Sequence, residues 1–189
     1  DRLVESGFAE LRGQRLGIVC NQASVAADYR HILDHALPNS KVVAAFGPQH
    51  GIWGHTQDNM IEWEGYEDST TGLRFYSLYG EHRKPTSEML EGIDTLIFDL
   101  QDVGARYYTF TWTLFLCLQQ CAAMGIKVWV LDRPNPISGL NPQGTVLEPE
   151  FASFVGLAPL PMRHGLTMGE LATHFKQTAF PNVELHVHQ

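Results

Sequence analysis

Short runs of apolar residues alternate along the chain with helical patterns and with polar segments that contain glycine. Each run is too short for a helix, which is typical of strands buried inside a sheet. The runs that predict strands are Arg15–Cys20, Lys41–Phe46, Arg74–Tyr79, Thr95–Leu100, Lys127–Asp132 and Val183–Val187.

Segments with apolar residues at helical spacing lie between these runs. The segments that predict helices are Val4–Leu11, Tyr29–Leu37 capped by Asp28, Thr86–Leu90, Tyr107–Met124 ended by Gly125, and Met168–Thr178 capped by Thr167. Between the strand that ends at Asp132 and the residue Gly165, no periodicity is visible, which predicts a loop. The alternation of strands and helices predicts an α/β fold with a mostly parallel sheet flanked by helices.

The composition fits an ordinary globular protein rather than a disordered one. The chain has 189 residues, of which 44% are hydrophobic and 18% charged, enough for one well-buried domain or part of a larger one. Its net charge of −8 argues against nucleic acid as a partner, which requires a basic patch. No apolar run approaches the roughly 20 residues that cross a bilayer, so we expect no membrane span. The chain starts at Asp1 without a visible signal segment, which leaves the compartment open.

The three cysteines predict neither disulfides nor a zinc site. Cys20 ends a predicted strand, and Cys117 and Cys121 lie four residues apart on a predicted helix. This spacing differs from a disulfide framework and from the close pairs of zinc sites. We expect all three thiols in the core.

Polar side chains follow the predicted strands at the points where the strands end. The residues at these points are Asn21, Gln49–His50, Gly80–Glu81, Gln101–Asp102 and Asp132–Arg133. Because the carboxyl ends of parallel strands share one edge of a sheet, we expect these groups to converge on a single cleft.

The clearest of these strand ends lies in the stretch Thr95–Arg106. There the apolar run is interrupted by Asp99 and then gives way to Gln101 and Asp102. Charged groups seldom lie fully buried without a partner, so two carboxylates, an amide and a guanidinium at one strand end indicate a ligand site. A helix start with a local Asp–Arg pair explains the same residues, since buried polar groups usually have structural partners.

A long irregular segment, residues 51–72, carries the aromatic residues Trp53, Trp63 and Tyr66. The polar residues among them are Gln57, Asp58, Asn59, Glu62, Glu64 and Asp68. Exposed aromatic rings mixed with amides and carboxylates are typical of sugar-binding surfaces, because the rings cover apolar faces while the polar groups meet hydroxyls. A loop that packs its own tryptophans explains the pattern equally well.

The sequence lacks the motifs of several common enzyme classes. The sequence has no Gly-x-Gly-x-x-Gly after its first strand, no Gly-Lys-Ser/Thr phosphate loop and no Gly-x-Ser-x-Gly elbow, so we expect no nucleotide cofactor and no serine nucleophile. His31 and His35 have a spacing that metal sites use, but without a third ligand they indicate a solvated helix face. His186 and His188 indicate an exposed strand face. We therefore expect no metal site.

The remaining chemistry is that of carboxylates and amides at a sheet edge. Glycoside hydrolysis needs two carboxylates, one protonated to assist the leaving group and one ionised. By their positions, the catalytic candidates are Glu81, Asp102 and Glu170. A binding module with the same polar edge would have the same composition, so both functions stay open at this point.

Several segments occur in an order that resembles one known family. They are Phe46–Gly51, Tyr76–Gly80 with Arg83–Pro85, Phe98–Arg106 with Tyr108–Thr109, Leu131–Pro136 and Arg163–Glu170. On these segments the chain resembles the NamZ-type exo-β-N-acetylmuramidases, formerly catalogued as a domain of unknown function. The resemblance covers nearly the whole chain.

The resemblance implies an enzyme that removes N-acetylmuramic acid from the non-reducing end of peptidoglycan fragments, in the cell envelope or secreted. It also implies a Rossmann-like N-terminal domain over residues 1–189 and a smaller C-terminal domain that this chain lacks, with the active site between the two. The expected partners are thus a peptidoglycan-derived sugar or muropeptide and that C-terminal domain. The alternative is a non-catalytic domain that binds muropeptides or other carbohydrates.

The expected substrate-binding residues fall on or beside the matching segments. They are Gln49, His50, Arg83, Gln101, Arg106, Tyr108, Asp132, Arg133, Asn135 and His164. Arg83 and Arg106 are best placed to hold the lactyl carboxylate of muramic acid with two parallel hydrogen bonds. Gln49 and Gln143 stand where family members commonly carry glutamate, and an amide cannot transfer a proton as a carboxyl group does. These two departures fit the binding-domain alternative.

Overall fold

A computed structural model describes residues 1–54, 56 and 61–189 of the chain. Its centre is a seven-stranded sheet with the order β3-β4-β2-β1-β5-β6-β9. The bounds of these strands are β1 (Arg15–Cys20), β2 (Lys41–Gly47), β3 (Tyr66–Glu67), β4 (Arg74–Ser77), β5 (Thr95–Asp99), β6 (Lys127–Leu131) and β9 (Leu185–His188). All neighbouring strands are parallel except β3, which runs antiparallel to β4 at one edge.

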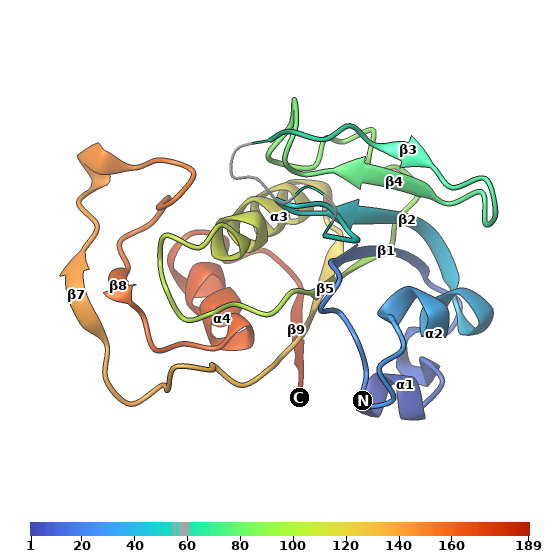
Figure 1. The fold of residues 1–189 in the computed structure, drawn as a ribbon, viewed down its shortest axis with the longest axis horizontal. Coiled ribbons are helices and arrows are strands. Elements are labelled where there is room, and N and C mark those ends of the chain that lie inside the picture. The colour runs from blue at the N-terminus through green and yellow to red at the C-terminus, as the bar shows by residue number, and fades with distance from the viewer. Residues whose placement is uncertain (55, 57–60) are drawn as a thin grey trace.

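Helices cover both faces of this sheet (Figure 1). The helices are α1 (Arg2–Glu5), the 3-10 turn η1 (Ala9–Leu11), α2 (Ile32–Asn39), α3 (Phe110–Met124) and α4 (Met168–Thr178). Successive strand residues point to opposite faces, so on β1 Ile18 packs in the cluster of α1, η1 and α2, whereas Val19 packs in the cluster of α3 and α4. The α/β fold with a mostly parallel sheet flanked by helices is confirmed.

The six parallel strands follow the doubly wound Rossmann-like order. The chain adds strands outward from β1 through β2 to β4, and then returns to the other side of β1 with β5, β6 and β9. The strand order therefore reverses between β1 and β5, and ligands of such sheets bind beyond the carboxyl ends of the strands near this point.

Two predicted helices at the N-terminal side differ from the structure. Within Val4–Leu11 the chain forms α1 and η1 separately. The prediction that Asp28 caps a helix from Tyr29 is wrong, because α2 begins at Ile32 and its cap is His31, whose Nδ1 accepts a hydrogen bond from the Leu33 amide at 3.3 Å. Asp28 lies before the helix, where its carboxylate accepts a hydrogen bond from the amide of Arg30.

Three more predicted elements need adjustment. The prediction of a helix over Thr86–Leu90 is wrong: the segment is a turn in which the Thr86 hydroxyl accepts a hydrogen bond from the Met89 amide at 3.2 Å. The last strand is shifted toward the C-terminus, to Leu185–His188, and α3 begins only at Phe110. By contrast, the bounds of β1 and α4 coincide with the predicted ones.

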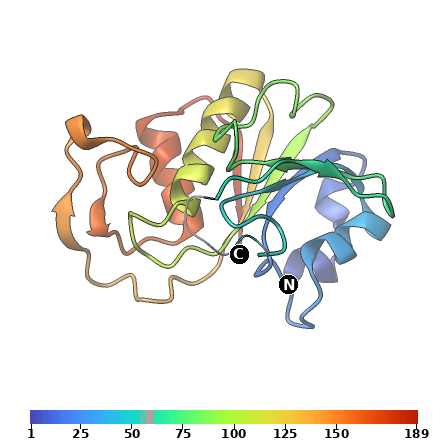
Figure 2. The same cartoon turned by 45° about the horizontal axis from the view of Figure 1, so that its top comes forward.

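The predicted loop before Gly165 contains a small second sheet. Its strands are β7 (Gln143–Val146) and β8 (Pro161–Arg163), and η2 (Pro149–Phe151) lies between them. We call residues 134–163 the arm. In Figures 1 and 2 it lies beyond α3 and α4, away from the main sheet. Sequence patterns missed β7 and β8 because both strands are exposed or half-buried along their length and carry no apolar run.

The three cysteines are free and buried, as predicted from their spacing. In the described part of the chain, no helix is both long and apolar enough to pass through a membrane.

Candidate active site

The polar residues that follow the strands all lie at the carboxyl ends of the strands, but they are spread across the sheet from β4 to β6. Glu81 follows β4 and Asp132 follows β6, and the strands β2, β1 and β5 lie between these two. Four spacings of about 4.8 Å put the ends of β4 and β6 roughly 19 Å apart. Glu81 lines a pocket beside β4, whereas Asp132 lines two others, so the single cleft is not confirmed and stays a prediction.

Asp102 and His164 form a buried pair next to β5. Nε2 of His164 lies 3.1 Å from Oδ2 of Asp102. Nδ1 of His164 accepts the Leu166 amide at 3.1 Å, so the ring proton lies on Nε2 and is donated to Asp102. The Asp102 carboxylate also accepts hydrogen bonds from the Thr111 hydroxyl and the Gly104 amide. Its oxygens are thus occupied by donors from three parts of the fold.

Asp132 anchors the start of α4. Its carboxylate accepts hydrogen bonds from the Thr167 hydroxyl and the Gly169 amide, both at 2.8 Å. Glu170 completes a capping box, in which its carboxylate accepts the Thr167 amide at 2.8 Å while the Thr167 hydroxyl accepts the Glu170 amide. Both carboxylates thereby satisfy amides that a helix start leaves without partners.

Asp99 lies at the end of β5 and pairs with Arg133, rather than with Arg106. Nε and Nη2 of Arg133 donate to Oδ1 of Asp99 at 3.0 and 2.8 Å. Burial raises the pKa of Asp99, and the Arg133 charge opposes this shift. The pair lines a pocket of about 370 Å³ together with Asp132, His188 and residues of α1.

Arg106 holds the arm rather than facing the strand ends. Its Nη1 donates to the carbonyls of Thr145 and Leu160 at 2.8 and 2.6 Å, and its own carbonyl accepts the Trp112 indole N–H at 2.7 Å. The structural interpretation of this arginine, as a partner of local groups, therefore accounts for its contacts, although the partners are carbonyls rather than carboxylates.

Three further expected residues make contacts between loops of the same edge. The Gln101 side chain donates to the Pro134 carbonyl at 2.9 Å, and that of Asn135 donates to the Leu166 carbonyl at 3.0 Å. Tyr108 lies half-buried with its ring edge-on to Phe110, and burial raises its pKa. These contacts tie the end of β5, the arm and the start of α4 together.

Gln49 and His50 follow β2, next to the end of β4. The Thr109 hydroxyl donates to the Gln49 side-chain oxygen at 2.8 Å. His50 has a φ of +73°, a left-handed conformation that costs energy for a residue with a side chain and that often accompanies function. Its Nδ1 lies 2.7 Å from the Thr56 carbonyl.

A pocket of about 660 Å³ lies beside β4 and contains Glu81. The other carboxylates that line it are Glu62 and Glu64, and the rings of Trp63 and Tyr76 complete its wall. The Glu81 side chain is 90% exposed, and its Oε1 lies 4.0 Å from Nε2 of His82. Glu170 is also exposed and lines a pocket near α4, but its carboxylate accepts the Thr167 amide. Of the three catalytic candidates, Glu81 is therefore the one whose carboxylate lies in a pocket without a hydrogen bond from the described residues.

Arg83 lies beside this pocket in a fixed orientation. Its guanidinium stacks on the Tyr79 ring at 3.6 Å and lies over the Phe154 ring at 4.9 Å. Its Nη2 donates to Oε1 of Glu62 at 3.1 Å. Aromatic stacking of this kind fixes the plane of the guanidinium.

In the aromatic segment before β4, one tryptophan packs inside the loop, whereas two other aromatic residues are exposed as on a sugar-binding surface. Trp63 is buried, and its indole N–H donates to the Pro48 carbonyl at 3.1 Å, as in a loop that packs on itself. Trp53 and Tyr66 are 47% and 37% exposed and are joined by a hydrogen bond of 3.0 Å. Gln57, Asp58 and Asn59 lie outside the described residues. Sequence reasoning assigned Glu62 and Glu64 only to this segment and missed them as neighbours of Glu81, because β3 folds back antiparallel to β4.

The expectation of a solvated face for His31 and His35 is wrong, because both side chains are buried. Nε2 of His31 bonds the Asn21 carbonyl at 2.9 Å, and Nε2 of His35 lies 3.2 Å from Asp28. Both imidazoles thus serve the packing of α2.

Comparison with known proteins places this arrangement in a family. The family described as exo-β-N-acetylmuramidase NamZ, N-terminal, matches residues 16–189. The chain is 44% identical over 179 residues to the peptidoglycan β-N-acetylmuramidase NamZ of Bacillus subtilis (strain 168). The aligned region covers 94% of this chain and 43% of the Bacillus subtilis protein.

Two crystal structures of DUF1343 family proteins from Bacteroides fragilis have the same fold. One, at 1.65 Å resolution, has a TM-score of 0.87 and 40% identity over 98% of this chain and 47% of its own. The other, at 1.30 Å, has a TM-score of 0.80 and 34% identity over 97% of this chain and 49% of its own. The chain thus spans less than half the length of these relatives. It belongs to the NamZ N-terminal family.

Proposed function

We propose that the full-length protein is a glycoside hydrolase that releases N-acetylmuramic acid from the non-reducing end of peptidoglycan fragments. Family membership supports this activity, since the Bacillus subtilis relative is named a peptidoglycan β-N-acetylmuramidase. The observation that carries the proposal is the pocket beside β4, where Glu81 lies open among further carboxylates and aromatic rings. Such a site offers both the acidic groups and the apolar surface that a sugar ring requires.

We assign the proton-transfer role to Glu81. Hydrolysis needs one carboxyl group beside the leaving oxygen and a second one that stays ionised. Asp102 and Glu170 are engaged by donors of the fold, so we assign them to positioning. Glu62 and Glu64 line the same pocket. Because Glu62 accepts a hydrogen bond from Arg83, we assign the role of the second carboxylate to Glu64.

We assign recognition of the lactyl carboxylate to Arg83. One nitrogen of Arg106 donates hydrogen bonds to two carbonyls of the arm. Arg83, by contrast, lies beside the pocket, and two aromatic rings fix the plane of its guanidinium. A guanidinium held in this way binds a carboxylate with two parallel hydrogen bonds. We expect Arg83→Ala to reduce the preference for muramic acid over N-acetylglucosamine, measured as the ratio of kcat/KM on the two chromogenic sugars, while turnover of the N-acetylglucosaminide persists. An unchanged ratio would reject this assignment.

Gln49 and His50 extend the proposed binding surface, because β2 neighbours β4 with Gly47 paired to Ser77. The other residues expected at the site contact the fold at the β5 and β6 ends, and we assign them supporting roles. They are Gln101, Tyr108, Asp132, Arg133, Asn135 and His164.

A muropeptide-binding domain without catalysis is the second candidate. It is favoured by the two glutamines, whose amides are already engaged: Gln49 accepts from Thr109, and Gln143 accepts from Arg163 at 3.3 Å. An amide at these positions cannot exchange protons with a substrate.

A chromogenic β-N-acetylmuramide separates the two candidates. We expect the full-length protein to release the chromophore, and Glu81→Gln to lower kcat by about 10²–10⁴ because it removes a general acid. Glu91→Gln is the matched control, since Glu91 is exposed and precedes β5 at the opposite edge of the sheet. No release by the native protein, with tight muropeptide binding, would favour the binding domain instead. Full turnover by Glu81→Gln would move the acid role to another carboxylate.

A further inference from the structure

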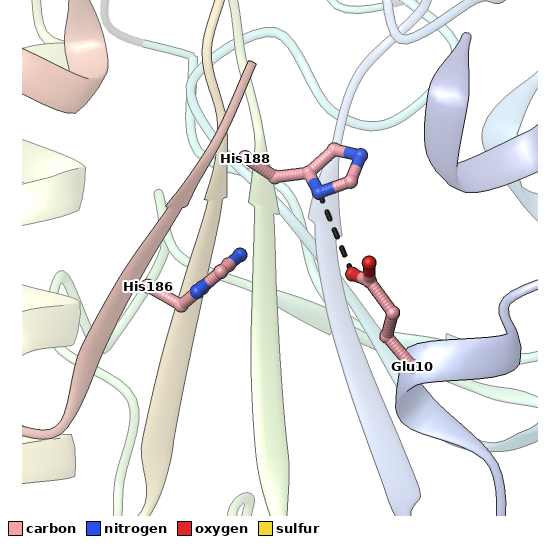
Figure 3. Close-up of side chains that lie close together, drawn as sticks. All are labelled: Glu10, His186 and His188. Atoms are coloured by element: carbon pink, nitrogen blue, oxygen red, sulfur yellow. Dashed lines mark ion pairs between the residues drawn. The ribbon is translucent and has the colours of Figure 1, made fainter.

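Three side chains of types that can bind metals lie close together on the face of the sheet opposite α3 and α4 (Figure 3). His186 and His188 lie two residues apart on β9, so both point to one face of this edge strand. Glu10 reaches toward them from η1. The cluster therefore joins the first segment of the chain to the last strand, away from the pocket beside β4.

The donor atoms lie close enough to share one ion. One carboxylate oxygen of Glu10 and one nitrogen from each histidine all lie within 4.8 Å of one another, and Nδ1 of His188 lies 3.7 Å from Oε2 of Glu10. Tetrahedral zinc with bonds of about 2.0–2.1 Å holds its ligand atoms about 3.4 Å apart. Small rotations of the exposed Glu10 and His186 side chains close the remaining gap.

Trp129 of β6 limits the orientation of both imidazoles. It pairs with His186 across the two strands, and the centroids of these two rings are 4.0 Å apart at an angle of 30°. The ring of His188 lies 5.8 Å from the same indole at 25°. Stacking on the indole restricts the side-chain conformations of both histidines before a metal binds, so less conformational entropy is lost on binding.

The hydrogen bonding of His188 also suits a metal ligand. Nε2 of His188 is buried without a hydrogen-bond partner among the described residues, and the contact with Glu10 exceeds hydrogen-bond length. Neither nitrogen is thus committed to the fold.

We propose that Glu10, His186 and His188 bind one divalent transition-metal ion of the zinc class. Two imidazoles and one carboxylate form a donor set that zinc uses with a fourth position open to water. Imidazole nitrogen favours zinc, copper and nickel over magnesium and calcium. The ion would link η1 to β9 and thereby fasten the N-terminal segment to an edge strand. This site departs from the expectation of an exposed strand face without a metal.

Isothermal titration of the untagged, chelator-treated full-length protein with zinc chloride tests the proposal. We expect one zinc ion per chain, and an upward shift of the thermal unfolding midpoint on adding zinc, because binding to the folded state stabilises it. His186→Ala and Glu10→Gln should each weaken binding by at least about tenfold. His174→Ala and Glu91→Gln are the matched controls, with side chains outside the cluster, and should bind as the native protein does.

Magnesium chloride in the same titration should give no comparable heat or shift. Both test variants replace exposed side chains, so a native circular dichroism spectrum is expected and makes the affinities comparable. Absence of zinc binding by the native protein would overturn the proposal, and so would an affinity that both variants leave unchanged. Because no glycosidase activity is measured, these outcomes are independent of the proposed hydrolase.

Discussion

Two groups of polar residues follow the strands of one sheet edge, and their surroundings differ. Near β5, β6 and α4, Asp102 and Asp132 accept hydrogen bonds from side chains and amides of the fold. Near β4, the Glu81 side chain is exposed in a pocket. The position of a residue after a parallel strand therefore indicates where polar side chains gather. Whether such a carboxylate is available for chemistry or serves the fold depends on how many hydrogen bonds it already accepts from the protein.

The physical reason is the cost of burial. A buried carboxylate without partners is far less stable than one in water, so the chain surrounds the buried Asp102 with donors. The half-buried Asp132 also accepts hydrogen bonds, and each carboxylate connects distant segments of the chain. Glu81 keeps its solvent, needs no partner for stability and stays available to a ligand. The comparison thus predicts that substitutions in the first group change the free energy of unfolding, and that those in the second change activity.

Asp102→Ala should have the largest effect on stability. The substitution leaves the His164 N–H, the Thr111 hydroxyl and the Gly104 amide without their buried acceptor. We expect the free energy of unfolding in urea to fall by about 3–5 kcal/mol. A loss below about 1 kcal/mol would mean that water replaces the carboxylate and that the pair is not a structural connection.

Gly169→Ala should have the next largest effect. A Cβ at this position would lie 2.7 Å from the carboxyl carbon of Asp132 and would also overlap Val187, so α4 must move away from β6 and β9. We expect a loss of about 1–3 kcal/mol in urea unfolding. Gly169 lies within α4 and has no positive φ, so the substitution brings no left-handed backbone strain, and Ala by itself favours a helix. A variant as stable as the native chain would therefore show that the close contact at Gly169 costs nothing.

Sequence patterns predicted the sheet and α4 well because each carries a local signal. The buried strands are apolar runs, and Thr167 with Glu170 forms a capping box within four residues. The cap of α2 was missed because His31 accepts a backbone amide with a ring nitrogen, which no local pattern distinguishes from an ordinary surface histidine.

The site was predicted only as far as the sheet edge. That Glu81 and Asp102 follow strands can be read from the chain, but which of them keeps free oxygens depends on contacts such as Asp102 with His164, 62 positions away. The same holds for Glu62, which approaches the pocket because β3 folds back on β4. Tertiary contacts therefore decide the role of each carboxylate.

The exposed ion pair of Arg15 and Asp94, at the opposite ends of the strands, should make a smaller contribution to the free energy of unfolding, and this contribution depends on pH. Hydrogen bonds from Arg15 lower the pKa of Asp94 to about 2, and Nη2 of Arg15 lies 2.7 Å from Oδ1. A lowered carboxyl pKa stabilises the fold above the unfolded value of about 3.9, and this stabilisation is lost as pH falls toward 2. In urea unfolding, the difference between the native chain and Asp94→Asn should therefore be present at pH 7 and shrink between pH 4 and 2. A difference that stays constant over this range would show that the ion pair contributes nothing.

Glu81→Gln should have the smallest effect on stability. The Glu81 side chain is 90% exposed, and its Oε1 lies 4.0 Å from Nε2 of His82. Substitutions on such a surface usually change the free energy of unfolding by less than about 0.5 kcal/mol, so urea unfolding should match that of the native chain and of Glu91→Gln. The same variant should lose turnover on the chromogenic muramide. Loss of activity with unchanged stability would show that Glu81 acts in the reaction. A marked loss of stability would instead show that Glu81, like Asp102 and Asp132, is a structural carboxylate.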